Sequence, residues 1–167
     1  KFSAYVFLKI GKLFRSKKII KQNIINALGN ISDSEIENIM ESMWRNYGFT
    51  FAEYIYLRKY RLNKFSEPHI DISGKEILDE VKKSNKPAVF VSGHFGNFEL
   101  MAMELDKYNL NLAAIYRPLN NFLINPYMIF LRKKYICKNQ IKKGLAGTKE
   151  VIEFLKKKHS IALMVDQ

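Results

Sequence analysis

A histidine and a glutamate stand five residues apart in a stretch that could carry out acid–base chemistry, Ser92-Gly93-His94-Phe95-Gly96-Asn97-Phe98-Glu99. Five residues turn a regular helix through about 140°, so His94 and Glu99 can meet only if His94 lies on a turn before the helix. Gly93 and Gly96 permit such a turn, because glycine adopts conformations closed to other residues. A carboxylate on one imidazole nitrogen would leave the other nitrogen to accept a proton. The alternative is that His94 is an ordinary loop histidine.

Other residue types with reactive side chains carry weaker signals. Ser92 could act as the nucleophile of a hydrolase, but it lacks the Gly-x-Ser-x-Gly turn that exposes such a serine. His69, beside Pro68, and His159, in a lysine-rich turn, lie in contexts typical of structural histidines. The single cysteine, Cys137, excludes a disulfide scaffold and a cysteine-ligated zinc site. We therefore expect neither a metal centre nor a cofactor.

The elements that must position His94 and Glu99 alternate between strands and helices. The apolar run Ala88–Val91 predicts a short strand buried on both faces, and a helix follows from about Phe98 to Tyr108. The later predicted elements are a strand over 112–116, helices over 122–134 and 147–157, and a last strand over 161–165. This alternation predicts an α/β fold with a largely parallel sheet flanked by helices.

Upstream of the sheet, the sequence predicts a helical region. The capping box Ser32-Asp33-Ser34-Glu35 opens a helix with apolar residues at the spacing of one helical face, and a second box, Ser73-Gly74-Lys75-Glu76, opens a helix to about Lys83. We expect residues 1–60 to form a helical, basic, membrane-proximal region and residues 61–167 to form the N-terminal part of an α/β catalytic domain. Because the chain stops at Gln167 directly after an apolar strand, we expect the C-terminal part of that domain to be missing.

Polar residues follow three of the predicted strands. His94 comes after the first strand, Arg117 after the second and Asp166 after the third. In parallel sheets, binding sites form at the edge where the strands end, so these side chains are expected to share one site. Asn120 and the adjacent Asn121 either bind a ligand there or only cap the following helix.

The net charge of +12 is concentrated in two stretches. Residues 1–31 hold seven Lys and Arg and no acid, and residues 131–159 hold ten against two acids, for net charges of +7 and +8. Such surfaces fit a phospholipid headgroup layer, a phosphorylated substrate or an acidic protein, unless they are merely solvated. We find no RNP-type aromatic motif, zinc finger or basic heptad pattern, so nucleic acid is not an expected partner.

The N-terminal stretch mixes lysines with large apolar side chains such as Tyr5, Phe7 and Leu13. An interfacial helix has this composition, because its apolar face enters the acyl boundary while its amines meet anionic lipid. A helix that packs on the rest of the protein is the alternative. No apolar run reaches the roughly 18 to 20 residues that span a bilayer.

Three ordered motifs resemble one family, the late acyltransferases of bacterial lipid A biosynthesis. They are Val91 to Leu100 around His94, the run Tyr116-Arg117-Pro118-Leu119-Asn120-Asn121, and the final Met164-Val165-Asp166-Gln167. The segments Met43-Trp44-Arg45-Asn46-Tyr47-Gly48 and Gly144-Leu145-Ala146-Gly147 fit the same family. Joint occurrence in this order is far more specific than any one motif.

The resemblance implies a fold like that of glycerolipid acyltransferases and a catalytic pair on His94 and Glu99. It also implies substrate-binding roles for Arg132, in the helix after Tyr-Arg-Pro, and for Asp166. The implied reaction moves a fatty acyl chain from an acyl carrier protein thioester to a hydroxyl of a phosphorylated glycolipid, the lipid A precursor, at the cytoplasmic face of the bacterial inner membrane. An anionic membrane surface is then a further partner.

Within that reaction, His94 would act as a general base without a covalent intermediate. Arg117 and Arg132 would bind phosphate or carboxylate groups, and backbone N–H groups near Gly96 and Asn97 would hold a phosphate or the developing oxyanion. Two alternatives stay open at this point. One is an acyltransferase acting on another lysolipid or glycolipid, and the other is a non-catalytic peripheral membrane-binding domain.

Overall fold

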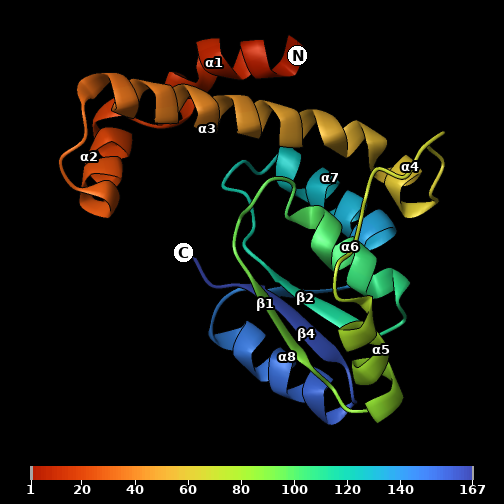
Figure 1. Ribbon diagram of the computed structural model, residues 1–167. Coiled ribbons are helices and arrows are strands. Elements are labelled where there is room, and N and C mark those ends of the chain that lie inside the picture. Colours follow the sequence, from red (N-terminus) through yellow and green to blue (C-terminus); the bar gives the residue numbers. More distant parts are fainter. Residues whose placement is uncertain (1, 167) are drawn as a thin grey trace. The chain divides into compact units, whose positions relative to one another are not determined.

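The computed structural model describes residues 2–166 and divides into two compact units, one ending at Tyr56 and the other beginning at Leu57 (Figure 1). Each unit has a hydrophobic cluster of its own. In the first unit Ile20, Ile36 and Met40 are buried together, and in the second Ala113, Ile141 and Ile161 are. The membrane-proximal role expected for residues 1–60 stays a prediction.

The first unit consists of α1 (Phe2–Phe14), α2 (Lys17–Leu28), α3 (Asp33–Glu53) and the 3-10 turn η1 (Tyr54–Tyr56). The capping box predicted at the start of α3 is confirmed. The N–H of Glu35 donates to Ser32 Oγ at 3.2 Å, and the N–H of Ser32 donates to Glu35 Oε2 at 2.9 Å. These two bonds satisfy donors that the first turn of a helix otherwise leaves without a partner.

Small residues let α1 and α3 approach closely. A Cβ on Gly48 would lie 2.6 Å from Ala4 Cα, and one on Gly11 would overlap the Trp44 ring. The N-terminal helix thus packs on a neighbouring helix, while its first residue, Phe2, is 81% exposed. Within residues 2–166, no helix combines the length and the apolar character needed to cross a bilayer.

The second unit is the predicted α/β fold. Its strands are β1 (Val89–Ser92), β2 (Leu112–Tyr116), β3 (Asn139–Lys142) and β4 (Ser160–Met164). Its helices are α4 (Leu57–Arg61), α5 (Lys75–Ser84), α6 (Glu99–Lys107), α7 (Ile124–Leu131), the π-helical turn η2 (Arg132–Ile136) and α8 (Leu145–Lys156). The alternation of strands and helices is confirmed. Strand β3 was not predicted, because Asn139, Gln140 and Lys142 make it mostly polar.

The sheet is parallel throughout, with the strand order β1-β4-β2-β3. Helices α6 and α8 lie on opposite sides of the strands (Figure 1). Phe154 and Leu155 of α8 pack on the cluster formed by Ala113, Ile141 and Ile161. Because β4 lies between β1 and β2, the last strand of the described chain is a neighbour of the first.

Two local predictions were wrong. β1 was expected to be buried on both faces, but Val89 and Val91 are 57% and 58% exposed, since β1 is an edge strand in the described sheet. Helix α5 was expected to start with a capping box from Ser73. Instead Gly74 occupies the N-cap position in the left-handed conformation, at φ 78°, and no side chain caps the helix.

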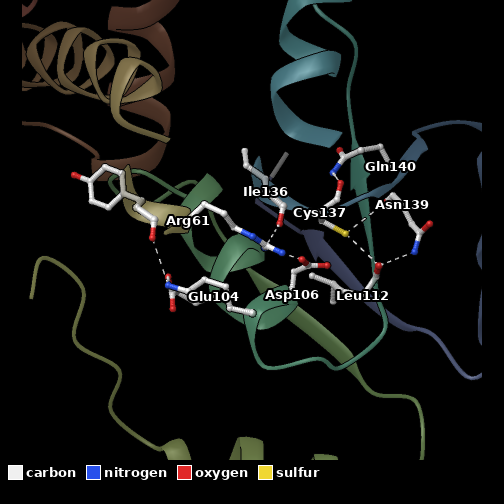
Figure 2. A network of polar contacts seen from close by, with 10 residues as sticks. Arg61, Glu104, Asp106, Leu112, Ile136, Cys137, Asn139 and Gln140 are labelled. Atoms are coloured by element: carbon white, nitrogen blue, oxygen red, sulfur yellow. Dashed lines mark hydrogen bonds and ion pairs between the residues drawn. The ribbon is translucent and has the colours of Figure 1, made fainter. Parts of the chain in front are cut away.

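A polar network fixes the end of the π-helical turn η2 (Figure 2). Arg61 of α4 pairs with Asp106 of α6 at 2.6 Å and donates to the carbonyl oxygen of Ile136 at 3.3 Å. The Cys137 thiol donates to the carbonyl oxygen of Leu112 at 3.1 Å, and Asn139 Nδ2 donates to the same oxygen at 3.2 Å. These bonds tie α4, α6, β2 and β3 together where η2 ends.

Candidate active site

The ends of three strands bring the predicted polar residues to one edge of the sheet. Ser92, the last residue of β1, is in register with Met164, the last residue of β4. The chain continues from these strands into His94 and Asp166, and from the neighbouring β2 into Arg117. The prediction that strand ends gather these residues at one edge is therefore confirmed.

His94 is held by Asp166 through two hydrogen bonds. Its backbone N–H donates to Asp166 Oδ2 at 2.8 Å, and its ring Nδ1 lies 2.7 Å from Asp166 Oδ1. The first bond, followed by that from the ring, lowers the pKa of Asp166 below its ordinary value. The carboxylate is thus ionised at neutral pH and accepts, so in the neutral form of the ring Nδ1 carries the proton and Nε2 has the lone pair. The His94 side chain is 30% exposed, so a ligand can reach the ring.

The turn after β1 is built around two glycines. A Cβ on Gly93 would come within 2.8 Å of the Phe95 ring and 3.3 Å of Asp166 Oδ2, so a larger residue would disturb the aspartate. Gly96 adopts φ 50°, in the region that favours glycine. The His94 ring meets Phe98 edge-on, with 4.6 Å between centroids. The imidazole is therefore positioned from two sides, by a carboxylate and by an aromatic ring.

Glu99 forms a buried ion pair with Arg132. Arg132 Nε donates to Glu99 Oε1 at 2.8 Å and Nη2 donates to the same oxygen, although 33 residues separate the two. The residues are 5% and 9% exposed. The guanidinium also lies 5.8 Å from the centre of the Tyr116 ring, at the end of β2. Arg132 opens the π-helical turn η2, a distortion that occurs frequently at functional sites.

The carboxylate at the His94 ring differs from the one that the sequence indicated. His94 does lie on the turn and Glu99 does begin α6, but within the described residues the ring bonds to Asp166. The bonds described above for Glu99 lead to Arg132 instead. The structure thus pairs the four residues as His94 with Asp166 and Glu99 with Arg132.

The remaining predicted residues lie around this site. Arg117 and Asn120 are exposed. Asn97 Oδ1 accepts from the N–H of Glu99 at 3.3 Å and so helps to begin α6. Asn121 Oδ1 accepts from the N–H groups of Leu123 and Ile124, at 3.0 and 3.2 Å, in the turn that leads into α7.

Two aromatic residues of the site were not singled out from the sequence. Phe98 contacts His94, and Tyr116 lies beside Arg132. Both lie in the motifs quoted above, where Phe98 directly precedes Glu99 and Tyr116 directly precedes Arg117. This proximity to charged site residues was the signal that could have identified them. The histidines predicted to be structural lie elsewhere in local contacts. His69 Nδ1 is 2.7 Å from the carbonyl oxygen of Glu67, and the His159 ring packs on Phe154.

An oriented imidazole and a buried ion pair at the open edge of a parallel sheet define the class of protein, an α/β domain whose strand ends carry residues suited to acid–base chemistry. The comparison with protein families identifies the family. Residues 2–167 match the bacterial lipid A biosynthesis acyltransferases, and the chain belongs to this family. An acyltransferase role in lipid A biosynthesis follows from that membership. A comparison with curated proteins gave no significant match.

Proposed function

We propose that this protein transfers a fatty acyl chain from an acyl carrier protein thioester to a hydroxyl of a phosphorylated lipid A precursor. The observation that carries the proposal is the His94–Asp166 pair, which leaves the basic Nε2 of a partly exposed imidazole available at the edge of the sheet. Membership of the lipid A acyltransferase family supports the reaction class and the acceptor. The acyl donor and the roles of the individual residues are part of this proposal and do not follow from the family.

In the proposed reaction, His94 acts as general base. Nε2 takes the proton from the acceptor hydroxyl as its oxygen attacks the thioester carbonyl carbon. The new carbon–oxygen bond forms, the tetrahedral intermediate expels the thiolate by breaking the carbon–sulfur bond, and the imidazolium returns its proton to that sulfur. Asp166 stabilises the imidazolium and holds its tautomer, so no covalent acyl-enzyme is required.

Glu99 is the second member of the proposed catalytic pair, and its contacts indicate how it serves His94. Its carboxylate holds Arg132 while its backbone begins the helix directly after Phe98, which touches the imidazole. We therefore assign Glu99 a role in fixing both the histidine turn and the arginine. A buried arginine next to the reacting atoms would stabilise negative charge that develops there.

The acceptor's phosphate is proposed to bind to polar groups at the exposed margin of the site. Arg117 is exposed at the end of β2, and a guanidinium binds phosphate with two parallel hydrogen bonds. Asn120 lies in the same loop, and Gly96, exposed at φ 50°, allows a ligand to approach the backbone closely. The N–H groups around Gly96 and Asn97 are proposed to contact the phosphate or the oxyanion.

The remaining partners are proposed from charge. The ten Lys and Arg of residues 131–159 fit the acidic acyl carrier protein, and the acid-free residues 1–31 fit an anionic bilayer. On this proposal the protein works at the cytoplasmic face of the bacterial inner membrane.

An acyl-transfer assay tests the proposal. The purified chain is incubated with acyl-loaded carrier protein and a tetraacylated lipid A precursor, and the mass added to the lipid is measured. We expect addition of one acyl chain, and its loss in His94→Ala. His69→Ala is the matched control, since His69 is exposed and packs on Phe65. Equal transfer by His94→Ala would contradict the mechanism, and transfer only to a lysophospholipid would contradict the acceptor.

A further inference from the structure

Large apolar side chains are exposed after every strand of the sheet. The turn after β1 exposes Phe95 by 81%, and the segment after β3 exposes Leu145 by 90%. The loop after β2 exposes Leu119 by 41%, Phe122 by 81% and Leu123 by 72%. The segment after β4 exposes Val165 by 59%. We call these six residues the apolar rim.

The opposite edge of the sheet has a different character. The exposed residues that directly precede the four strands are Lys86, Pro87, Asn109, Asn111, Lys138, Lys157 and Lys158. None of them carries a large apolar side chain. Isolated exposed apolar residues are ordinary, but six in four separate segments after the strands, and none among the exposed residues that directly precede them, is an asymmetry that calls for an apolar partner.

The rim is interleaved with positive charge. Arg117 is exposed in the β2 loop, and Lys142 and Lys143 are exposed at the end of β3. The N–H of Lys143 donates to the carbonyl oxygen of Tyr116 at 2.9 Å, which ties the segment after β3 to the end of β2. Two acids near this edge are already paired, Asp166 with His94 and the buried Glu99 with Arg132.

We propose that the apolar rim inserts into the acyl boundary of an anionic phospholipid bilayer, with Arg117, Lys142 and Lys143 at the headgroup level. Apolar tips flanked by cations match the two layers of a membrane surface, hydrocarbon below and phosphate above. The apolar side chains stand in four separate segments, and a fluid acyl layer fills the spaces between them, whereas a rigid protein would need a matching pocket for each.

The location of the rim gives this contact a consequence. It lies at the same edge as His94 and Asp166, so insertion would bring the imidazole to the bilayer surface, where lipid hydroxyls and phosphates lie. The inference adds a second contact to the one proposed for residues 1–31, and it concerns binding alone. It can therefore be tested without donor or acceptor, and its failure is distinct from a failure of the proposed acyl transfer.

A fluorescent label tests insertion at one position. The substitution Leu123→Cys is coupled to an environment-sensitive dye, and Cys137 stays unlabelled because it is 1% exposed and burial raises the pKa of its thiol to about 12. The full chain is mixed with vesicles of phosphatidylcholine alone or of equal parts phosphatidylcholine and phosphatidylglycerol. We expect the dye emission to shift to shorter wavelength and to intensify with the anionic vesicles.

The matched control places the dye elsewhere on the same unit. Ile152, on α8, is 50% exposed and lies away from the strand ends, so a dye on Ile152→Cys is expected to stay in water. Vesicle binding with no change at residue 123, or an equal change at both positions, would overturn the proposal. A change at residue 123 that depends on protein concentration without vesicles would assign the rim to a second copy of the chain instead.

Vesicle co-sedimentation provides the second measurement. Burial of one large apolar side chain is worth enough to change an equilibrium roughly tenfold or more, so Phe122→Ser with Leu123→Ser should weaken binding by at least about tenfold. Ile77→Ser with Ile152→Ser is the control pair, because both isoleucines are exposed on helices and neither belongs to the rim. Binding that weakens equally in the two pairs would contradict a specific role for the rim.

Discussion

The carboxylate of Asp166 accepts a hydrogen bond from both the backbone and the ring of His94, a residue 72 positions earlier. The two side chains meet because β4 pairs directly with β1. One contact fixes the turn, and the other fixes the ring and its tautomer. Asp166 therefore controls both the position and the protonation of the proposed base.

Replacement of Asp166 by asparagine should impair acyl transfer. The amide would keep the size of the side chain, but it would lose the charge that stabilises the imidazolium and fixes Nδ1 as the donor. We expect Asp166→Asn to lower kcat/KM by about 100- to 10,000-fold in the acyl-transfer assay. Asp71→Asn, at an exposed position, serves as the control. Retention of full activity would remove Asp166 from the mechanism.

The same aspartate predicts a pH dependence of stability. Its pKa is lowered in the folded state, first by the N–H of His94 and then by the ring, so folding favours the ionised form. A group of this kind contributes stability above its unfolded pKa, near 4, and the contribution disappears as the pH falls through the lowered folded value. The difference in unfolding free energy between the wild type and Asp166→Asn should therefore shrink as the pH falls below about 4. Denaturant titrations at each pH measure it.

The Glu99–Arg132 pair should reveal itself in a double-mutant cycle. Because both side chains are buried, removal of one partner leaves an uncompensated charge, and such changes cost about 3 to 5 kcal/mol. Glu99→Gln and Arg132→Met are each expected to destabilise the protein by that amount, and the double variant by much less than their sum. Urea unfolding gives the three values. Additive effects would mean that the two residues do not act as a pair.

The order of elements was predictable from local patterns. Apolar runs marked β1, β2 and β4, and the Ser32 box marked α3, because hydrophobic spacing and caps are properties of neighbouring residues. Strand β3 has no such pattern, since Gln140 and Lys142 interrupt it. It is a strand because Ala113 to Tyr116 offer it a parallel ladder, which local sequence does not encode.

The position of the polar residues at one edge of the sheet was predictable, but the pairing of their side chains was not. Residues after strand ends in an α/β sheet meet at one edge whatever the strand order, which brought His94, Arg117 and Asp166 together. Which acid reaches the imidazole depends on the order β1-β4-β2-β3, a long-range property. Glu99, close in sequence, instead faces a guanidinium that the π-helical turn η2 brings to the start of α6.

Gly147 is predicted to be intolerant of a side chain. It lies in α8, and a Cβ there would overlap the carbonyl oxygen of Lys142, at the end of β3. Backbone must then move, so Gly147→Ala should destabilise the protein by about 1 to 3 kcal/mol despite the better helix propensity of alanine. Thermal unfolding measures the change. Lys149→Ala, exposed in the same helix, should stay within about 0.5 kcal/mol of the wild type.

Cys137 is predicted to be inert in the folded protein. It is 1% exposed and its thiol donates to the carbonyl oxygen of Leu112, within the network of Figure 2. Burial, and then the nearby carboxylate of Asp106, raises its pKa to about 12. Since the thiolate is the reactive form, the thiol should react with an aromatic disulfide reagent at pH 8 only when the region between β2 and β3 opens.

The measurement compares the rate of thiol modification with that of an exposed cysteine. Leu123→Cys provides the reference, because residue 123 is 72% exposed, and its added thiol should react many times faster than Cys137 in the same chain. Urea below the unfolding midpoint should accelerate the reaction of Cys137 alone. A raised thiol pKa also means that folding favours the protonated form, so stability should fall as the pH rises from about 9 towards 12. Equal rates at the two cysteines in the absence of urea would show that β2 and β3 do not protect the thiol.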